Sequence, residues 1–185
     1  VQTCALPIWL NEIRDGVNSQ LTVLVQDVNF YASSIASLNN RIQATQGNPS
    51  QPPNDLMDQR DAMVAKLNQL VGATVVRQDD GSFNVFIGSG QNLVVGSQSY
   101  TMTVLPGRDD PAAPLIGYTV GSNTVTLDTR SLNSGKMGGL LAFREEALAS
   151  ARNTLGQVAA GLAVSFNELH AAGQDLGGQL GGAFF

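Results

Sequence analysis

Few residues in this chain have side chains that could carry out chemistry. His170 is the only histidine and Cys4 the only cysteine. A single cysteine forms no internal disulfide, and a zinc site needs three or four ligands, for which no carboxylates stand at a supporting spacing. Ser165 precedes His170 by five residues, about 140° around a helix axis, so the two side chains do not meet as nucleophile and base. A helix-end or turn-stabilising role for His170 is therefore favoured over a catalytic one.

Two glycine-containing stretches resemble ligand-binding loops, and neither has the required pattern. Gly135-Lys136 matches the end of a phosphate-binding loop, but Arg130 stands where that motif needs its first glycine and Met137 where it needs a hydroxyl. Residues 175–182 (DLGGQLGG) lack the spaced acidic ligands that calcium requires, which favours a flexible turn. The sequence therefore predicts no catalytic, cofactor-binding or metal-binding residues.

The composition favours contacts with other proteins. Charged residues make up 14% of the chain, against about 25% in ordinary soluble domains. The net charge is -5 and no Lys/Arg cluster is present to neutralise phosphates, which argues against nucleic-acid binding. No apolar run approaches the ~20 residues of a membrane span, and no apolar, positively charged signal stands at the N-terminus. A structural or interaction role fits this composition better than binding of a charged ligand.

The most regular pattern is a leucine repeat within residues 139–173. Leucines recur every seven residues, a period typical of a helix that supercoils against a partner. The predicted seam residues of this helix are Leu141, Leu148, Leu155, Val158 and Leu162. Because Gly156 and Gly161 each weaken the helix by about 1 kcal/mol, we expect packing along the seam to hold it. We therefore expect Leu155→Asp to unfold the helical part.

A second heptad pattern runs from about Leu10 to Thr45. Its apolar residues follow one another three and four positions apart, which predicts a helix with one buried face. Those residues are Leu21, Leu24, Val28, Tyr31, Ile35, Leu38 and Ile42. The opposite side carries Asn18, Gln26, Ser33, Asn40 and Arg41. The glycine- and proline-rich segment 47–53 is expected to end this helix and turn the chain.

A shorter helix is predicted to follow and to end at Gly72. Asn54 or Asp55 is expected to cap it, and Asp55 and Asp58 lie in its first turn, where the helix dipole favours carboxylates. Its apolar stripe consists of Leu56, Met63, Leu67 and Leu70. Arg60 also lies in that stripe, which leaves two alternatives open. Either its stem packs while its head reaches solvent, or its head meets a carboxylate of another helix.

The hydrophobic pattern then changes to an alternation with a period of two, which is typical of strands. The segments 79–81 (DDG) and 121–123 (GSN) each lie between two short apolar runs and predict hairpins. Strands are expected at residues 74–78, 83–87, 91–95, 100–105, 115–120 and 124–128. Their short length and close spacing predict an antiparallel meander.

These patterns together predict an α+β protein. We expect an elongated, heptad-seamed antiparallel helical bundle with an antiparallel β-meander inserted between its N- and C-terminal helices, which lie side by side. The expected segments are an N-terminal helical half at 10–72, the β insertion at 73–130, a C-terminal helix or helices at 131–173 and a truncated glycine-rich end at 174–185. Residues 1–9 are expected to be foreign, because residues 1–8 (VQTCALPI) resemble the conceptual translation of a sequencing-adapter primer.

Six segments carry a pattern more specific than hydrophobic periodicity. They are residues 52–61 (PPNDLMDQRD), 67–76 (LNQLVGATVV), 79–94 (DDGSFNVFIGSGQNLV), 134–148 (SGKMGGLLAFREEAL), 153–170 (NTLGQVAAGLAVSFNELH) and 172–185 (AGQDLGGQLGGAFF). In this order they resemble the flagellar hook-associated protein family of the hook–filament junction (FlgK), over nearly everything after Trp9. The residues that match the family pattern are Pro53, Asn54, Asp55, Asp58, Arg60, Asp61, Gly139, Phe143, Arg144, Phe166, Asn167, His170, Gly173 and Asp175. Leu169 departs from the pattern, because family members tend to carry glutamine before the histidine.

The resemblance implies a non-enzymatic axial protein of the bacterial flagellum that needs no cofactor. Such a protein would be exported unfolded, without a cleavable signal, and would form an adaptor ring outside the cell between hook and filament. The implied partners are further copies of itself, the hook protein, the second junction protein, and the export apparatus with its chaperone. Nucleic-acid binding and membrane insertion are not expected.

Other functions stay open on the sequence alone. Another axial component, either a flagellin or the second junction protein, is the first alternative, although the β insertion favours the hook-side member. A hydrolase that uses His170 is the second alternative, and a surface adhesin on a helical stalk is the weakest.

Overall fold

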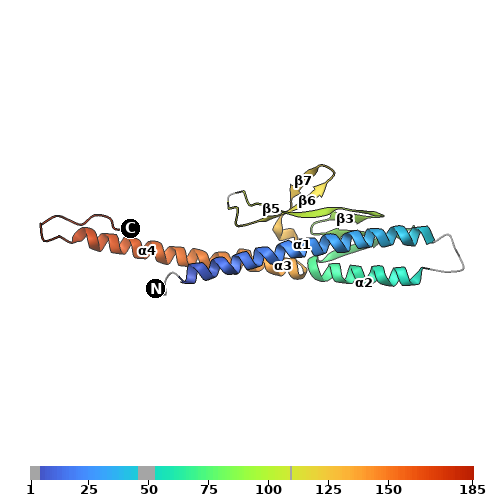
Figure 1. Ribbon diagram of the computed structural model, residues 1–185, viewed down its shortest axis with the longest axis horizontal. Coiled ribbons are helices and arrows are strands. Elements are labelled where there is room, and N and C mark those ends of the chain that lie inside the picture. The colour runs from blue at the N-terminus through green and yellow to red at the C-terminus, as the bar shows by residue number, and fades with distance from the viewer. Residues whose placement is uncertain (1–4, 46–52, 109) are drawn as a thin grey trace.

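Long helical segments give the molecule its rod shape (Figure 1). The computed structural model describes residues 5–45, 53–108 and 110–185. Its longest helix is α1 (Ala5–Thr45), with 41 residues, and is therefore roughly 60 Å long. Helix α2 (Asn54–Val71) runs back along the C-terminal half of α1. Helix α3 (Gly135–Ala142), the π-helical turn η2 (Phe143–Leu148) and α4 (Ala149–Ala172) follow one another as a second helical rod. The predicted elongated α+β bundle is confirmed.

Part of the predicted foreign segment, including Cys4, lies outside the described residues. From Ala5 onward the chain forms α1, in which Leu6, Ile8 and Trp9 are exposed and Leu10 is the first buried residue. The predicted turn at 47–53 also lies outside the described residues, except for its last residue. The foreign origin of residues 1–9 and the other segment boundaries therefore stay predictions.

The β insertion is antiparallel throughout, as predicted, and it is divided into two sheets. The first sheet has the order β1 (Ala73–Arg77), β2 (Phe83–Ile87), β3 (Gln91–Val95) and β4 (Gln98–Ser99). The second has the order β5 (Thr101–Leu105), β6 (Leu115–Val120) and β7 (Asn123–Thr126). The short strand β4 was not expected from the sequence. It forms because Gly96, at φ +57, allows a tight turn that lays Gln98 opposite Val95.

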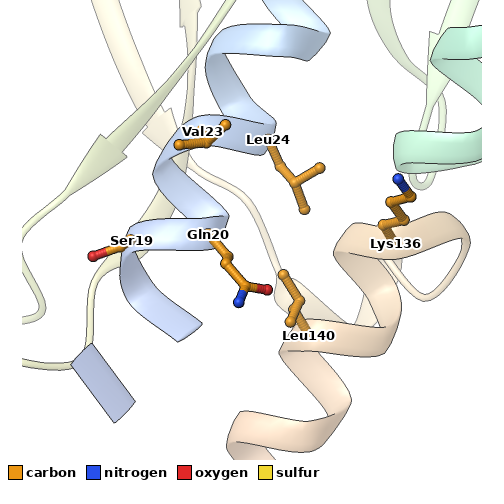
Figure 2. Close-up of a pocket in the computed structure, with 6 residues that line it drawn as sticks. All are labelled: Ser19, Gln20, Val23, Leu24, Lys136 and Leu140. Atoms are coloured by element: carbon orange, nitrogen blue, oxygen red, sulfur yellow. The ribbon is translucent and has the colours of Figure 1, made fainter. Parts of the chain in front are cut away.

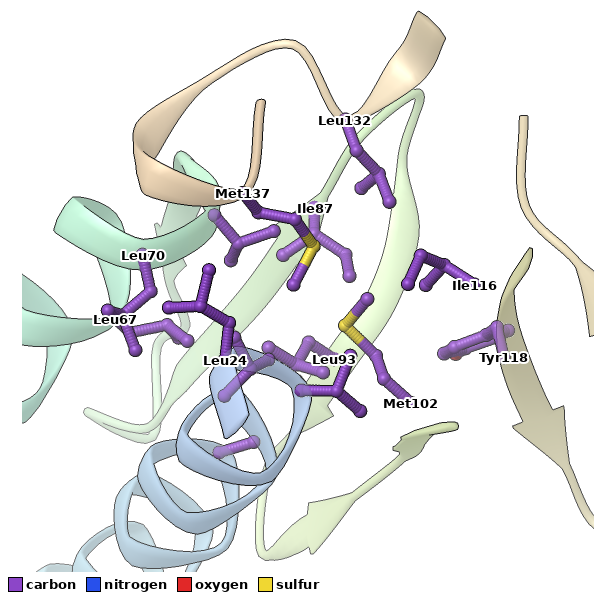
Figure 3. Close-up of a cluster of buried hydrophobic side chains, with 14 of the residues drawn as sticks. Leu24, Leu67, Leu70, Ile87, Leu93, Met102, Ile116, Tyr118, Leu132 and Met137 are labelled. Carbon is purple, nitrogen blue, oxygen red and sulfur yellow. The ribbon is translucent and has the colours of Figure 1, made fainter. Parts of the chain in front are cut away.

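The hydrophobic core lies where α1, α2 and α3 meet the two sheets. Figure 3 shows Leu24 of α1, Leu67 and Leu70 of α2 and Met137 of α3 pointing toward side chains of the β insertion. Burying each such side chain contributes about 1.5–3 kcal/mol. The largest fully buried residues come from every one of these elements and include Leu21, Ile35, Leu67, Ile87, Leu93, Met102, Ile116, Leu132 and Met137. The insertion therefore shares one core with the helices.

The end of α2 and the start of α3 approach so closely that both positions require glycine. Gly72, at φ +62, ends α2 as predicted, and an added Cβ there would lie 2.3 Å from the Cβ of Ser134. Gly135, at φ +68, begins α3, and its Cβ would lie 2.7 Å from the carbonyl carbon of Leu70. A side chain at either position would force the two helices apart.

The predicted cap of α2 is wrong. Asn54 is the first residue of the helix, and Pro53 precedes it without a side-chain cap hydrogen bond. The carbonyl of Pro53 instead accepts hydrogen bonds from the backbone N–H groups of Leu56 and Met57. Asp55 lies in the first turn, as expected, but Asp58 lies in the second turn, so its predicted place is wrong. A proline with φ -79 is compatible with the residue before a helix, which the preference for polar caps did not suggest.

The expectation that the C-terminal helix packs along the N-terminal helix is wrong beyond Leu148. Leu141 and Leu148 are buried, Leu155 is half-buried, and α4 contains no buried residue. The cause is the position at which the chain returns to α1. Helix α3 meets α1 near the middle of its length, so α4 soon runs past the beginning of α1 (Figure 1). Val158 and Leu162 are consequently exposed.

Candidate functional site

The predicted seam residues divide into a buried set and an exposed set. The buried set comes from α1, α2 and the start of the second rod and consists of Leu21, Leu24, Val28, Ile35, Leu38, Ile42, Leu67, Leu70, Leu141 and Leu148. Tyr31, Leu56, Met63 and Leu155 are half-buried. On α4, Val158 is 55% exposed and Leu162 is 66% exposed. Together with Phe166 and Leu169, which are also exposed and lie on the same side of the helix, they form an apolar surface that we call the α4 surface.

Arg60 has neither of the surroundings proposed for it. The residue is 2% exposed, so its head does not reach solvent. Its guanidinium donates hydrogen bonds to Asn39 Oδ1 at 3.0 Å and to the Gly81 carbonyl at 2.8 Å, and it lies 3.5 Å from the centre of the Phe83 ring. Both acceptors are neutral, so the predicted carboxylate partner is absent from these bonds. Burial lowers the pKa of Arg60 from its ordinary value.

Asn39 is the partner that the sequence did not reveal. Its side-chain NH₂ donates to the carbonyls of Phe83 and Gly96, and its Oδ1 also accepts from the Phe83 backbone N–H. With Arg60 it joins α1, α2 and the β1–β2 turn in one buried network, which fixes how the helices sit on the first sheet. Asn39 and Gly81 each stand 21 residues from Arg60. No local spacing signal links them.

Two further asparagines of α1 bind the second sheet and the loop between β5 and β6. Asn29 exchanges two hydrogen bonds of 2.8 Å with the backbone of Met102 on β5. Asn18 donates to the carbonyl of Ala112 and is half-buried, although it was assigned to the solvent side of the helix. These residues anchor the β insertion on α1 at separate points. The polar side of α1 is thus partly a binding face for the sheets.

An apolar groove lies between α1 and α3. It has a volume of about 540 Å³ and is lined by Ser19, Gln20, Val23, Leu24, Lys136 and Leu140. Figure 2 shows Leu24 and Leu140 extending into the space between the two helices. Lys136 is the single ionisable group of this lining, so the groove offers no acid–base pair. Its chemistry is suited to receiving apolar side chains.

The chain folds back on the end of α4 after Gly173. Asn167 Oδ1 accepts hydrogen bonds from the backbone N–H groups of Phe184 and Phe185. The Nδ1 atom of His170 lies 2.7 Å from the Gly182 carbonyl oxygen, and its ring stacks on Phe166. His170 thus lies at the end of α4 and contacts the returning chain, as a helix-end or turn-stabilising role would have it.

Asp175 begins the turn itself. Its Oδ1 atom accepts hydrogen bonds from the backbone N–H groups of Gly177 and Gln179. Its carboxylate thus completes a backbone turn, which agrees with the preference for a turn over a calcium loop.

The remaining residues of the family pattern are mostly at the surface. Pro53 is half-buried, and Asn54, Asp55, Asp58 and Asp61 are exposed at the start of α2. Gly139, Phe143 and Gly173 are exposed on the second rod. Arg144 is half-buried and donates a 2.8 Å hydrogen bond to the Pro114 carbonyl, which ties η2 to the loop between β5 and β6. The structure does not bring these residues together in one place.

Within the described ranges, no group of three or more His, Cys, Asp or Glu side chains is placed to hold a metal ion. Among the same residues, no helix combines the length and apolar character needed to cross a bilayer. The features that the structure does provide are extended surfaces: the α4 surface and the groove between α1 and α3. Such surfaces are suited to packing against other helices.

Comparison with known proteins identifies the family. Residues 6–185 match the family described as flagellar hook-associated protein FlgK helical domain. Flagellar hook-associated protein 1 of Escherichia coli is 40% identical over 179 residues, which are 96% of this chain and 33% of that protein. The protein of the same name from Salmonella typhimurium is 39% identical over 96% of this chain and 32% of its own length.

A solved structure agrees with these sequence matches. The flagellar hook junction protein FlgK from Burkholderia pseudomallei superimposes with a TM-score of 0.90 at 38% identity. The match covers 98% of this chain and 33% of that protein. The chain thus spans about a third of the length of the relatives it matches. On the sequence match, the identity and the shared fold together, the chain belongs to the FlgK family of flagellar hook-associated proteins.

Proposed function

We propose that this chain is the helical part of a structural adaptor at the hook–filament junction of the bacterial flagellum. The observation that carries the proposal is the α4 surface. A helix of 24 residues has no buried residue, yet it presents Val158, Leu162 and Phe166 to solvent. An exposed apolar surface of this extent is typical of a face that is covered in an assembly. Membership of a family named for the hook junction supports the same function.

The α4 surface packs against a helix of the full-length protein that lies outside this chain. The support for this occupant is length: the matched relatives are about three times as long as the chain, so they contain further segments that can supply a helix. A 3.5-residue leucine period specifies a helical partner rather than a sheet. The exposed seam residues Val158 and Leu162 are then buried in the complete protein, as the sequence pattern requires.

The partners proposed for the assembled protein are those of an axial component. It associates with further copies of itself in a ring, with the hook protein on one side and with the second junction protein on the other. It reaches the outside of the cell through the flagellar export apparatus, with a chaperone and without a cleavable signal. It acts without catalysis. The sequence resemblance supports these proposals.

The test is addition of the full-length protein to purified hooks, followed by the second junction protein and flagellin. We expect the protein to bind hook ends and to permit filament growth. Electron microscopy of the hook ends measures both steps. A folded sample that leaves hooks bare would contradict the proposal, and so would filament growth at the same rate without the protein.

Two matched variants test the role of the α4 surface. Leu162→Asp places a charge on the proposed helix contact, and Lys66→Asp makes an exposed change on α2, away from that surface. We expect Leu162→Asp to lower the melting temperature of the full-length protein and to abolish hook binding, while Lys66→Asp leaves both unchanged. Equal behaviour of the two variants would show that the surface has no partner helix.

A further inference from the structure

An arginine-lined pocket lies where the two helical rods meet the β insertion. It has a volume of about 360 Å³ and is lined by residues of α1, of the segment leading into β6, and of η2 with the start of α4. Arg14, Arg144 and Arg152 bring three guanidinium groups to this one pocket, and Glu145 is the one carboxylate of its lining. The chain has only 10 Lys and Arg residues and a net charge of -5. Three of these ten positive charges are therefore gathered at one place.

Glu145 in the lining and Asp15 beside the pocket offset part of this charge and leave a positive excess. Arg14 pairs with Asp15 at 3.0 Å, and Arg144 lies 3.6 Å from Glu145 while donating to the Pro114 carbonyl. Within the described residues, no ion pair or hydrogen bond joins the side chain of Arg152 to another group. Each guanidinium has five N–H donors, so most donors of the three arginines have no partner in the described part of the chain. A carboxylate entering the pocket would find several of them.

A row of carboxylates lies at the far end of the rod. Asp55, Asp58 and Asp61 follow one another three residues apart on the first two turns of α2, so they lie along one side of the helix. All three are exposed, and no ion pair to them exists among the described residues. The start of α2 lies at the end of the molecule opposite to α4 (Figure 1). The two charged sites of one chain therefore do not meet each other.

We propose that the arginine pocket of one subunit binds the aspartate row of a second copy of this chain. The two sites are complementary in charge and lie at different positions on the same rod, so the contact is heterologous. A heterologous contact leaves one free site of each kind on every pair and therefore continues from subunit to subunit. It produces a ring or a helical row, whereas a self-complementary contact would stop at a dimer. The proposal rests on the proposed function, because it assigns the contact by which the adaptor associates with itself.

A second copy fits the pocket better than an unrelated acidic protein. Two chains of net charge -5 repel one another over most of their surfaces, so association needs local complementarity. The arginine pocket and the aspartate row provide this local charge complementarity, and every copy of the chain carries both. The side-by-side contact that results is staggered along the rods, since the two sites lie at different heights on each of them.

Charge reversal of the full-length protein tests the proposal. Arg152→Glu and Asp58→Arg each make one site repel the other, and the double variant restores opposite charges at every contact. We expect each single variant to weaken self-association by about tenfold or more, and the double variant to recover it. A mixture of the two single variants should also associate, because alternating subunits are complementary at every contact. Sedimentation velocity measures the association.

Two variants with the same charge changes elsewhere are the controls. Arg77→Glu on β1 and Asp27→Arg on α1 alter exposed residues outside both sites, and we expect both to associate like the wild type. Circular dichroism melts confirm that every variant is folded. Absence of self-association in the wild type, equal effects of the site and control variants, or a double variant that stays dissociated would each overturn the proposal. Binding of the wild-type protein to hook ends tests the proposed function independently of the contact between subunits.

Discussion

The α1–α2 region and the α4 region carry the same kind of leucine-rich pattern, and they have opposite surroundings. In the first region most seam residues are buried against the other helices and the two sheets, whereas α4 has no buried residue. Helix α1 is also held on the sheets by side-chain hydrogen bonds, which Asn29 and Asn39 make to strand backbone. A heptad period therefore indicates that a helix needs a partner. It does not indicate whether that partner belongs to the same stretch of chain.

The largest expected difference between the two regions comes from a charge placed in each seam. Leu21 is fully buried, so Leu21→Asp should destabilise the 185-residue chain by roughly 4 kcal/mol or more. Leu162→Asp should change the stability of the same chain by no more than about 0.5 kcal/mol, because Leu162 is exposed. Thermal unfolding followed by circular dichroism measures both.

Equal destabilisation of the chain by Leu21→Asp and by Leu162→Asp would contradict this difference between the two regions. That result would mean that α4 is packed within this chain in solution. The structure also revises the expectation for Leu155→Asp. Because Leu155 is half-buried, we now expect an effect between those of the two variants.

The next largest effect should come from the buried network around Arg60. Arg60→Ala removes the donor to the Gly81 carbonyl and one donor to Asn39 Oδ1, and it leaves a cavity beside Phe83. We expect a loss of about 3 kcal/mol in unfolding free energy, measured by urea denaturation. Lys66→Ala, at an exposed position on the same helix, is the matched control and should cost less than about 0.5 kcal/mol. A small effect of Arg60→Ala would mean that the network does not hold the helices on the sheet.

Glycine substitutions should have opposite signs in the two regions. Gly72→Ala should destabilise the chain by about 2 kcal/mol or more, because φ is +62 and the new Cβ would collide with Ser134. Gly156→Ala should stabilise α4 by about 1 kcal/mol, because nothing lies within 4 Å of the position and alanine favours a helix. Helix content and melting temperature measure the two effects. A destabilising Gly156→Ala would reveal a close contact on α4 and would contradict the contrast.

The sequence predicted the elements well because their signals are local. Helical periods, the hairpin turns and the closing glycine at Gly72 depend on residues near one another in the chain, and the predicted helices and longer strands formed. The family pattern predicted the overall architecture. Relations between distant residues were not predictable. Arg60 meets Asn39 and Gly81 only after α2 and the first sheet have folded onto α1. The end of the packed seam at Leu148 likewise depends on where the second rod returns to α1.

The smallest expected effect concerns the turn that joins the first sheet to α1, and it depends on pH. Asp80 accepts hydrogen bonds from the Ser82 hydroxyl and backbone N–H and from the Gln43 side chain. The Ser82 hydroxyl bond is the main cause that lowers the pKa of Asp80 from its ordinary value. Because the pKa is lower in the folded chain, the ionised carboxylate stabilises the fold above the unfolded pKa, near 4, and this contribution is lost as the pH falls through the folded value. Asp80→Asn should therefore be less stable than the wild type at neutral pH and nearly equal to it in acid, once the pH is below the lowered pKa of Asp80 in the folded chain. Asp27→Asn, which removes the same charge elsewhere on α1, corrects for net charge, and a stability gap for Asp80→Asn that persists in acid would rule out this role for the carboxylate.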